Sequence, residues 1–195
     1  AASRVLNRVV GNGASDIFGK LTSNGQWWLV NPHGILFGPG AQVDVGALVA
    51  STLRVTDADF LAGRGKFGGA GPASGTVVNE GSITTPRLDG TDAVSSFGGR
   101  VWLVGASVHN KGAITTPQGQ IVLAAGHNIE LVDSGVPNVT VRLSAPEDEV
   151  LNDGQGRLLA AGGGSIDLFG AIVNQNGIVR ADGLAAGEQG RVTIR

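Results

Sequence analysis

Carboxylates and histidines are the side chains of this 195-residue chain that could do chemistry. Asp57 and Asp59 form an Asp-x-Asp pair, whereas Glu147, Asp148 and Glu149 follow one another directly. A calcium-dependent polysaccharide lyase needs carboxylates that converge on one ion and a basic residue that takes a proton. Consecutive acidic residues do not converge in this way. Solvated loop charge is therefore the preferred interpretation, and a polysaccharide lyase is the less favoured one.

The histidines His33, His109 and His127 show none of the spacings that bind metals, such as H-x-H or H-E-x-x-H. His109 and His127 fall at expected turns of neighbouring repeats, where ordinary surface positions are the preferred interpretation. Cysteine is absent, which excludes disulfides, thiolate nucleophiles and cysteine-bound metals. The sequence therefore predicts a protein that is not an enzyme and that carries no metal or cofactor.

Composition narrows the class of protein further. Apolar residues make up 42% of the chain and charged residues 15%, a balance opposite to that of disordered proteins. A formal net charge of −2 gives no basic footprint, so no nucleic-acid partner is expected. No apolar run approaches the roughly 20 residues of a membrane helix, so membrane insertion is not expected. No signal peptide is visible at the start of the chain.

Internal repeats show how the chain must be organised. A glycine-bounded phrase of alternating apolar residues occurs at 98–108, 119–126, 163–173 and from residue 190 onward. A second phrase, N-x-G-x-I-T-T-P, occurs at 79–86 and again at 110–117. The unit is about 20 to 25 residues long, which is typical of solenoid proteins.

Such a unit fits either an antiparallel meander or a parallel β-helix, in which each unit winds once. Residues that occupy the same position in successive repeats are similar in type: Val101 and Ile121, Leu103 and Leu123, and Asn79 and Asn110. This stacking favours an all-β fold, a right-handed parallel β-helix that forms a single domain over residues 1–195.

Two stretches interrupt the repeat. Residues 56–76 are rich in glycine, and we expect them to form a hairpin or loop outside the helix, with Phe60 and Phe67 covering a sheet face. Residues 144–164 are expected to form an irregular acidic insertion, either a loop followed by one helical turn or an irregular coil.

The most distinctive segment is Asn31-Pro32-His33-Gly34-Ile35. Asn-Pro favours a type I or II turn, and Gly34 can adopt a positive φ. A strand is expected to enter this turn over 27–30 and another to leave it over 35–37. On physical grounds alone the segment is a tight corner of the β-helix.

This segment resembles a motif of the two-partner secretion domain. That domain stands at the N-terminus of large Gram-negative exoproteins such as filamentous haemagglutinin, high-molecular-weight adhesins, haemolysins and contact-dependent inhibition toxins. The family motif Asn-Pro-Asn-Gly-Ile is matched here with His33 at the second asparagine. Residues 5–9 and 50–53 also resemble the high-molecular-weight adhesin branch, and the resemblance covers nearly the whole chain.

Two departures accompany the resemblance. Asp44-Val45-Gly46-Ala47 takes the place of a second asparagine-rich turn of the adhesin branch. The family domain also starts several dozen residues earlier, with strands that cap the helix, so the N-terminal cap is expected to be truncated. An uncapped edge strand is open to strand addition.

The resemblance implies a secretion signal with Asn31, Pro32, His33, Gly34 and Ile35 as the secretion motif. An outer-membrane transporter with POTRA domains would bind the exoprotein in the periplasm. The domain would then fold at the cell surface, or be secreted, and template the β-helix behind it. Residues 5–10 or 27–30 could add as a strand to a POTRA sheet. We also predict that Asn31→Ala impairs export more than folding.

The alternatives are a β-helical adhesin shaft and a glycan-binding or receptor-binding module. Trp27 and Trp28 point to opposite faces of the expected strand, so one is expected in the core and the other on the surface, where it could stack on a sugar. Binding to a host receptor or glycan would belong to the full-length protein.

Overall fold

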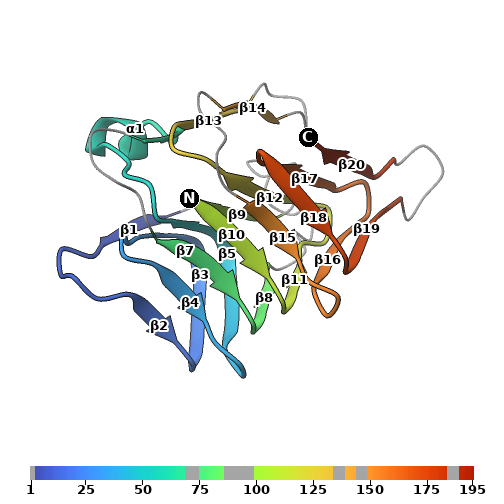
Figure 1. Ribbon diagram of the computed structural model, residues 1–195, viewed down its shortest axis with the longest axis horizontal. Helices are drawn as coiled ribbons and strands as arrows, with labels where there is room; N and C mark the ends of the chain where they lie inside the picture. Colours follow the sequence, from blue (N-terminus) through green and yellow to red (C-terminus); the bar gives the residue numbers. More distant parts are fainter. Residues whose placement is uncertain (1–2, 69–74, 86–98, 134–138, 144–148, 184–188) are drawn as a thin grey trace.

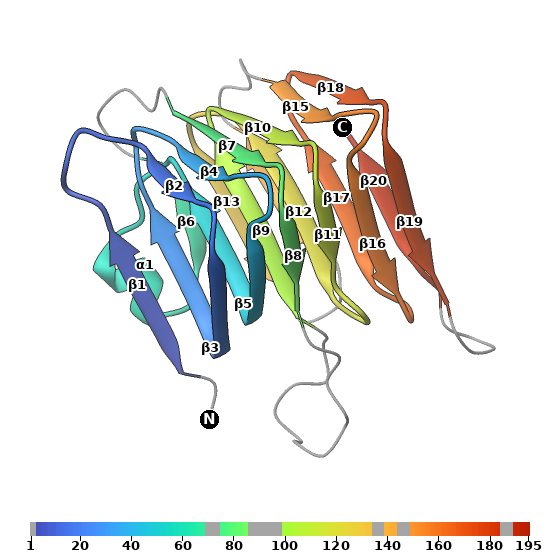
Figure 2. The ribbon, with the colours of Figure 1, turned by 90° about the horizontal axis from the view of Figure 1, so that it is seen from below.

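The computed structural model describes residues 3–68, 75–85, 99–133, 139–143, 149–183 and 189–195. The chain winds into a stack of parallel coils, and Figure 2 shows these coils in sequence order from the N-terminal to the C-terminal end. The predicted parallel β-helix is therefore confirmed. The described part of the chain holds no helix that is long and apolar enough to cross a membrane.

Each coil contributes strands to three faces. The first face is a six-stranded parallel sheet of β2 (Ser15–Ile17), β4 (Ile35–Phe37), β7 (Thr76–Asn79), β10 (Ser107–Asn110), β15 (Glu149–Asn152) and β18 (Ile172–Gln175). The second face holds the first halves of β3 (Lys20–Val30) and β5 (Gln42–Ser51), then β8 (Ser82–Thr84), β11 (Ala113–Thr115), β16 (Arg157–Ala161) and β19 (Ile178–Asp182). The third face holds β1 (Arg4–Arg8), the second halves of β3 and β5, β9 (Arg100–Gly105), β12 (Gln120–Ala125), β17 (Ser165–Phe169) and β20 (Arg191–Ile194).

The long strands β3 and β5 join the second and third faces into one eleven-stranded sheet. Their pairing shifts register between Ser23 and Gln26, where the chain bends from one face to the other. Glycine is needed at this bend, because a Cβ on Gly46 would lie 2.7 Å from the carbonyl oxygen of Asn24. Residues 44–47, which take the place of the asparagine-rich turn noted above, lie within β5.

The stacking predicted from the repeats is confirmed in register. Val101 lies beside Ile121, Leu103 beside Leu123, and Asn79 beside Asn110. The inward-facing apolar residues of the three faces form one continuous core along the stack. Because side chains alternate across a strand, each coil adds the same inward positions to this core.

Of residues 56–76 the structure describes 56–68 and 75–76, in which no two strands form a local hairpin, while 56–68 lie outside the solenoid. They begin with the short helix α1 (Asp57–Leu61) and continue into β6 (Gly65–Phe67), which pairs antiparallel with the distant β13 (Ile129–Asp133). With β14 (Val139–Leu143), these strands make a three-stranded sheet outside the solenoid (Figure 1). The strand that pairs with β6 is β13, which lies far away in the sequence. The local sequence of 56–76 therefore cannot reveal this sheet.

The outer surface of the third face is covered by this extra unit. Phe60 and Phe67 both pack on Trp28, with ring centroids 5.4 and 6.0 Å away, and Trp102 lies 6.5 Å from the same ring. The prediction that the two phenylalanines cover a sheet face is thus confirmed. These aromatic residues belong to a second apolar cluster, separate from the solenoid core.

Residues 149–161 differ from the predicted irregular insertion, because β15 and β16 are regular strands of the solenoid. Leu158 and Ala160 are completely buried, whereas Leu159 and Ala161 are half-buried on the other side of β16. This alternation belongs to a strand and not to a helical turn. Residues 144–148 lie outside the described part of the chain.

Candidate functional site

The motif Asn31 to Ile35 forms a tight turn at the corner between the third and first faces. It joins the end of β3 to the start of β4, as predicted. The Gly34 N–H donates to the carbonyl of Asn31 over 3.2 Å, and Gly34 adopts a φ of 121°. That φ lies in the region that favours glycine, which explains the residue type at this position.

The side chain of Asn31 holds the corner together. Its carbonyl oxygen accepts from the His33 N–H at 3.0 Å, and its amide nitrogen donates to the carbonyl of Gly13 and the hydroxyl of Ser15, each at 2.9 Å. Asn31 is completely buried. One amide therefore closes its own turn and fastens that turn to the preceding coil.

The three segments that carry the family resemblance meet at this corner. Val9 donates its N–H to the carbonyl of Val30 at 2.9 Å, and Asn31 donates its N–H to the carbonyl of Ser51 at 3.0 Å. Residues 5–9, 31–35 and 50–53 thus lie in successive layers of the same corner. The turn could be predicted from sequence, but the bonds that Asn31 donates to Gly13 and Ser15 could not, since nothing in the local sequence of these two residues indicates a partner.

Exposure divides the motif into two parts. Asn31, Gly34 and Ile35 are buried, and Ile35 belongs to the solenoid core. Pro32 is half-buried, and His33 is exposed. In the folded chain, a partner at this corner can therefore touch His33 and part of Pro32, whereas the other motif side chains face inward.

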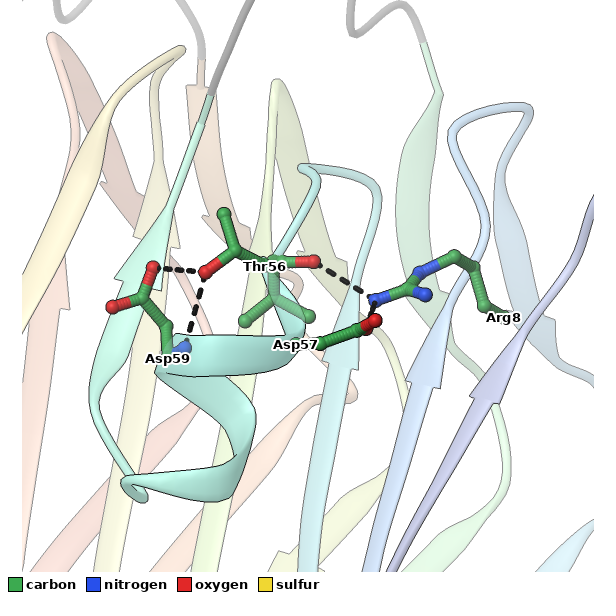
Figure 3. Close-up of polar contacts among 5 residues, drawn as sticks. Arg8, Thr56, Asp57 and Asp59 are labelled. Atoms are coloured by element: carbon green, nitrogen blue, oxygen red, sulfur yellow. Dashed lines mark hydrogen bonds and ion pairs between the residues drawn. The ribbon is translucent and has the colours of Figure 1, made fainter.

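A second polar cluster ties the N-terminal strand β1 to the helix α1 (Figure 3). Arg8 donates to the carboxylate of Asp57 at 2.9 Å and to the carbonyl of Val55 at 3.0 Å. Thr56 caps the helix by accepting from the Asp59 N–H at 3.0 Å and donates to the Asp59 carboxylate at 2.6 Å. The sequence signal for this helix is the Thr-x-x-Asp cap, which resembles a capping box.

The carboxylates considered for calcium chemistry have other partners. The hydroxyl of Thr56, then Arg64 at 2.8 Å, lowers the pKa of Asp59 below its usual value. Asp57 pairs with Arg8, and Glu149 receives a hydrogen bond from Asn174. The described residues contain no group of three or more His, Asp or Glu side chains suited to a metal ion. Glu147 and Asp148 lie outside the described residues.

His109 does not lie in the predicted turn. It stands within β10, and its ring nitrogen is 3.8 Å from the carboxylate of Glu149 on the neighbouring strand. His127 follows β12 in a bend, as predicted. The structure therefore does not pair these two histidines through matching positions of two turns.

The tryptophans do not form a sugar platform. Trp28 and Trp102 are each 1% exposed beneath the extra unit, and Trp27 is half-buried and packs against the solenoid core. Trp27 and Trp28 do lie on opposite faces of β3, as predicted. However, neither is an exposed ring, so the basis for glycan stacking at this pair is lost.

Comparison with known proteins shows which family this fold belongs to. The family model described as TPS secretion domain matches residues 1–155. The chain belongs to the TPS secretion domain family. TPS denotes two-partner secretion, in which an outer-membrane transporter exports its partner protein from a Gram-negative bacterium. The family is non-catalytic, and its members are secreted proteins.

Relatives of this TPS secretion domain come from Haemophilus influenzae. A heme/hemopexin-binding protein is 34% identical over 161 residues, which are 79% of this chain and 17% of that protein. A second protein of the same description is 50% identical over 46 residues, or 24% of this chain and 5% of that protein. This TPS secretion domain thus spans a small part of the curated relatives that it matches.

The solved structure of the HMW1 secretion domain from Haemophilus influenzae matches 98% of this chain and 48% of that one. The TM-score is 0.79 at 30% sequence identity. This match extends beyond residue 155, where the family model ends, and so includes the last coils of the TPS secretion domain.

Proposed function

We propose that this TPS secretion domain is the export signal of a larger exoprotein and that the POTRA domains of its outer-membrane transporter bind it in the periplasm. After export, the domain folds at the cell surface and serves as the template for the coils that follow it. Residues Asn31, Pro32, His33, Gly34 and Ile35 form the secretion motif. The observation that carries the proposal is the meeting of residues 5–9, 31–35 and 50–53 at one corner of the first coils.

The burial of the motif indicates at which stage, before or after folding, the transporter binds it. Asn31 and Ile35 are buried in the folded chain, with 0% and 1% of their surface exposed. A transporter that recognises these side chains must do so before the corner closes. Residues 27–30 are also unavailable in the folded chain, because β3 pairs with both β1 and β5. We therefore assign recognition to the unfolded chain, which can add to a POTRA sheet as a strand.

Strand β1 is the second candidate for strand addition. Among the described strands it pairs only with β3, and Val5 on it is 46% exposed. In contrast to residues 27–30, this segment has a neighbouring strand on one side only among the described residues. It is therefore a segment that a POTRA sheet could still bind after folding.

Binding to the purified POTRA region of the cognate transporter tests the proposal. Chain freshly diluted from urea is compared with fully refolded chain, each as the native sequence, Asn31→Ala and His33→Ala. Recognition of the unfolded chain predicts tight binding just after dilution, loss of affinity on refolding, and weaker binding by Asn31→Ala. Equal binding by the folded native chain, weakened by His33→Ala alone, would instead place the contact on the exposed tip of the turn.

Haem or haemopexin binding, like adhesion, belongs to the full-length protein in this proposal. Secretion and display are the task of this domain, and the regions that follow it carry the receptor-directed activity. A heme/hemopexin-binding relative supports that assignment for the whole protein. Pull-down of haemopexin by the full-length protein, but not by residues 1–195, is the expected result.

A further inference from the structure

A column of amide side chains runs through the solenoid at the corner between the first and second faces. Asn79, Asn110 and Asn152 end the strands β7, β10 and β15, and Gln175 ends β18. These residues lie side by side in the parallel pairing. The three asparagines have 0% of their surface exposed, so their amides depend on one another for hydrogen bonds.

All the bonds between these amides point the same way along the stack. Asn79 donates to Asn110 at 2.8 Å, Asn110 to Asn152 at 2.8 Å, and Asn152 to Gln175 at 3.0 Å. The Asn110 amide also donates to the carbonyl of Gly112 at 3.2 Å, within its own turn. One N–H of Asn110 thus closes its own coil while the other reaches the next coil.

The two ends of the column differ. At the N-terminal end the register partner of Asn79 is Phe37, which offers no donor, and the Asn79 oxygen accepts from the Gly81 N–H at 3.2 Å. At the C-terminal end the Gln175 amide donates to the carbonyl of Gly177 at 2.8 Å. A column that is still growing would therefore present an N–H donor toward the coil that has yet to form.

We infer that Asn79, Asn110, Asn152 and Gln175 set the register in which each new coil joins the stack. A slip of one residue is already forbidden, because it turns the apolar residues outward. A slip of two residues keeps the apolar pattern, so contacts at particular positions must oppose it. The unpaired amide of the last coil supplies such a contact, since a buried N–H donor left without an acceptor is destabilising.

The corner between the second and third faces shows what the column adds. Thr85 and Thr116 are also completely buried there, yet their hydroxyls have no hydrogen-bond partner among the described residues. These two hydroxyls therefore do not bind one another across coils, in contrast to the amides of the column. Thr116→Val is therefore a matched control that removes a buried polar atom without touching the amide column.

Register can be read directly because the chain has no cysteine. Ser82 and Ala113 are register partners on the outer side of the second face, and Thr115 lies two residues further along β11. The chain with Ser82→Cys and Ala113→Cys reports the native register after refolding in an oxidising buffer. The chain with Ser82→Cys and Thr115→Cys reports the two-residue slip.

The two reporters are compared in the native background, in Thr116→Val, and in a fourfold variant. The fourfold variant combines Asn79→Leu, Asn110→Leu, Asn152→Leu and Gln175→Leu. In the first two we expect the native cross-link to exceed the slipped one at least tenfold. In the fourfold variant, which replaces the amides with apolar side chains, we expect the two yields to come within threefold of each other. A tenfold preference that survives in the fourfold variant overturns the inference.

A smaller variant decides the matter if the fourfold variant does not refold. Asn79→Leu with Asn110→Leu changes only the two coils that carry the reporters, and the same two outcomes apply to it. The inference rests on the proposed template role of the domain. Since no transporter is present in the experiment, its outcome is independent of whether POTRA domains bind the chain.

Discussion

The side-chain amide of Asn31 donates to the hydroxyl of Ser15 over 2.9 Å, and this bond joins the proposed secretion motif to the coil before it. The same amide binds the carbonyl of Gly13, and its oxygen accepts from His33. All of these bonds form at a residue with no exposed surface. The motif therefore stabilises the packing of the first coils and is also a candidate signal.

Asn31→Ala is accordingly expected to lower the free energy of unfolding by about 1–3 kcal/mol, because it leaves buried partners without hydrogen bonds. This changes the expectation from sequence that export suffers more than folding, since both should suffer. Urea unfolding followed by circular dichroism measures the loss. His33→Ala, at the exposed tip of the same turn, is the control and should change the stability by less than about 0.5 kcal/mol. Equal stability of native chain and Asn31→Ala would contradict the structural role.

Gly112 lies where two coils approach closely, and a Cβ there would overlap the carbonyl oxygen of Gly81 in the coil before it. Gly112→Ala should therefore destabilise the chain by about 3 kcal/mol or more, because backbone on both sides must move. Gly154→Ala is the matched control, since no atom lies within 4 Å of its added Cβ. Thermal unfolding of the two variants should separate them clearly, and similar melting temperatures would argue against tight stacking at Gly112.

The stacking itself could be predicted from sequence because a β-helix repeats the same inward positions in every coil. Asn79 over Asn110 follows from one phrase occurring twice, without knowledge of any distant contact. The helix α1 has a local signal in Thr56 and Asp59, but its place depends on Arg8, 47 residues before Val55. Contacts of that kind join segments whose sequences carry no common pattern.

Residues 149–161 show where the sequence pattern was misleading. Their acidic start and the run Leu-Leu-Ala-Ala conceal a plain in–out alternation, which becomes visible only when β16 is aligned with Ala113, Ile114 and Thr115 of β11. The strand is buried by its neighbours in the stack and not by its own amphipathic pattern. Tertiary context therefore outweighs local propensity in this coil.

The contact of Arg8 with α1 predicts a local effect. Arg8→Ala removes the bonds to Asp57 and Val55, but the ion pair is exposed to solvent, so global stability should fall by less than about 1 kcal/mol. Hydrogen exchange over residues 56–64 should nevertheless become faster. Arg180→Ala, which removes an exposed pair with Asp182 on the second face, is the control and should leave that segment unchanged. Unchanged exchange in Arg8→Ala would mean that the aromatic packing alone holds the helix.

Asp167 predicts how stability depends on pH. It is 1% exposed on β17, and burial raises the pKa of its carboxyl above the usual 3.8, although Thr193, Arg191 and Gln120 act in the opposite direction. Between 3.8 and the raised value, the folded chain binds more protons at Asp167 than the unfolded chain does. This residue's contribution to stability therefore increases as the pH falls through that window and decreases as the pH rises through it.

Asp167→Asn removes this titration while it keeps a polar side chain of similar size. Urea unfolding of both chains across acidic pH isolates the contribution as the difference between the two stability curves. At neutral pH Asp167→Asn gains by avoiding a buried charge but loses the ion pair with Arg191 at 3.3 Å. The difference should shift in favour of the native chain as the pH falls toward 3.8. A shift in favour of Asp167→Asn over the same range would show that the ion pair outweighs burial and that the pKa is lowered instead.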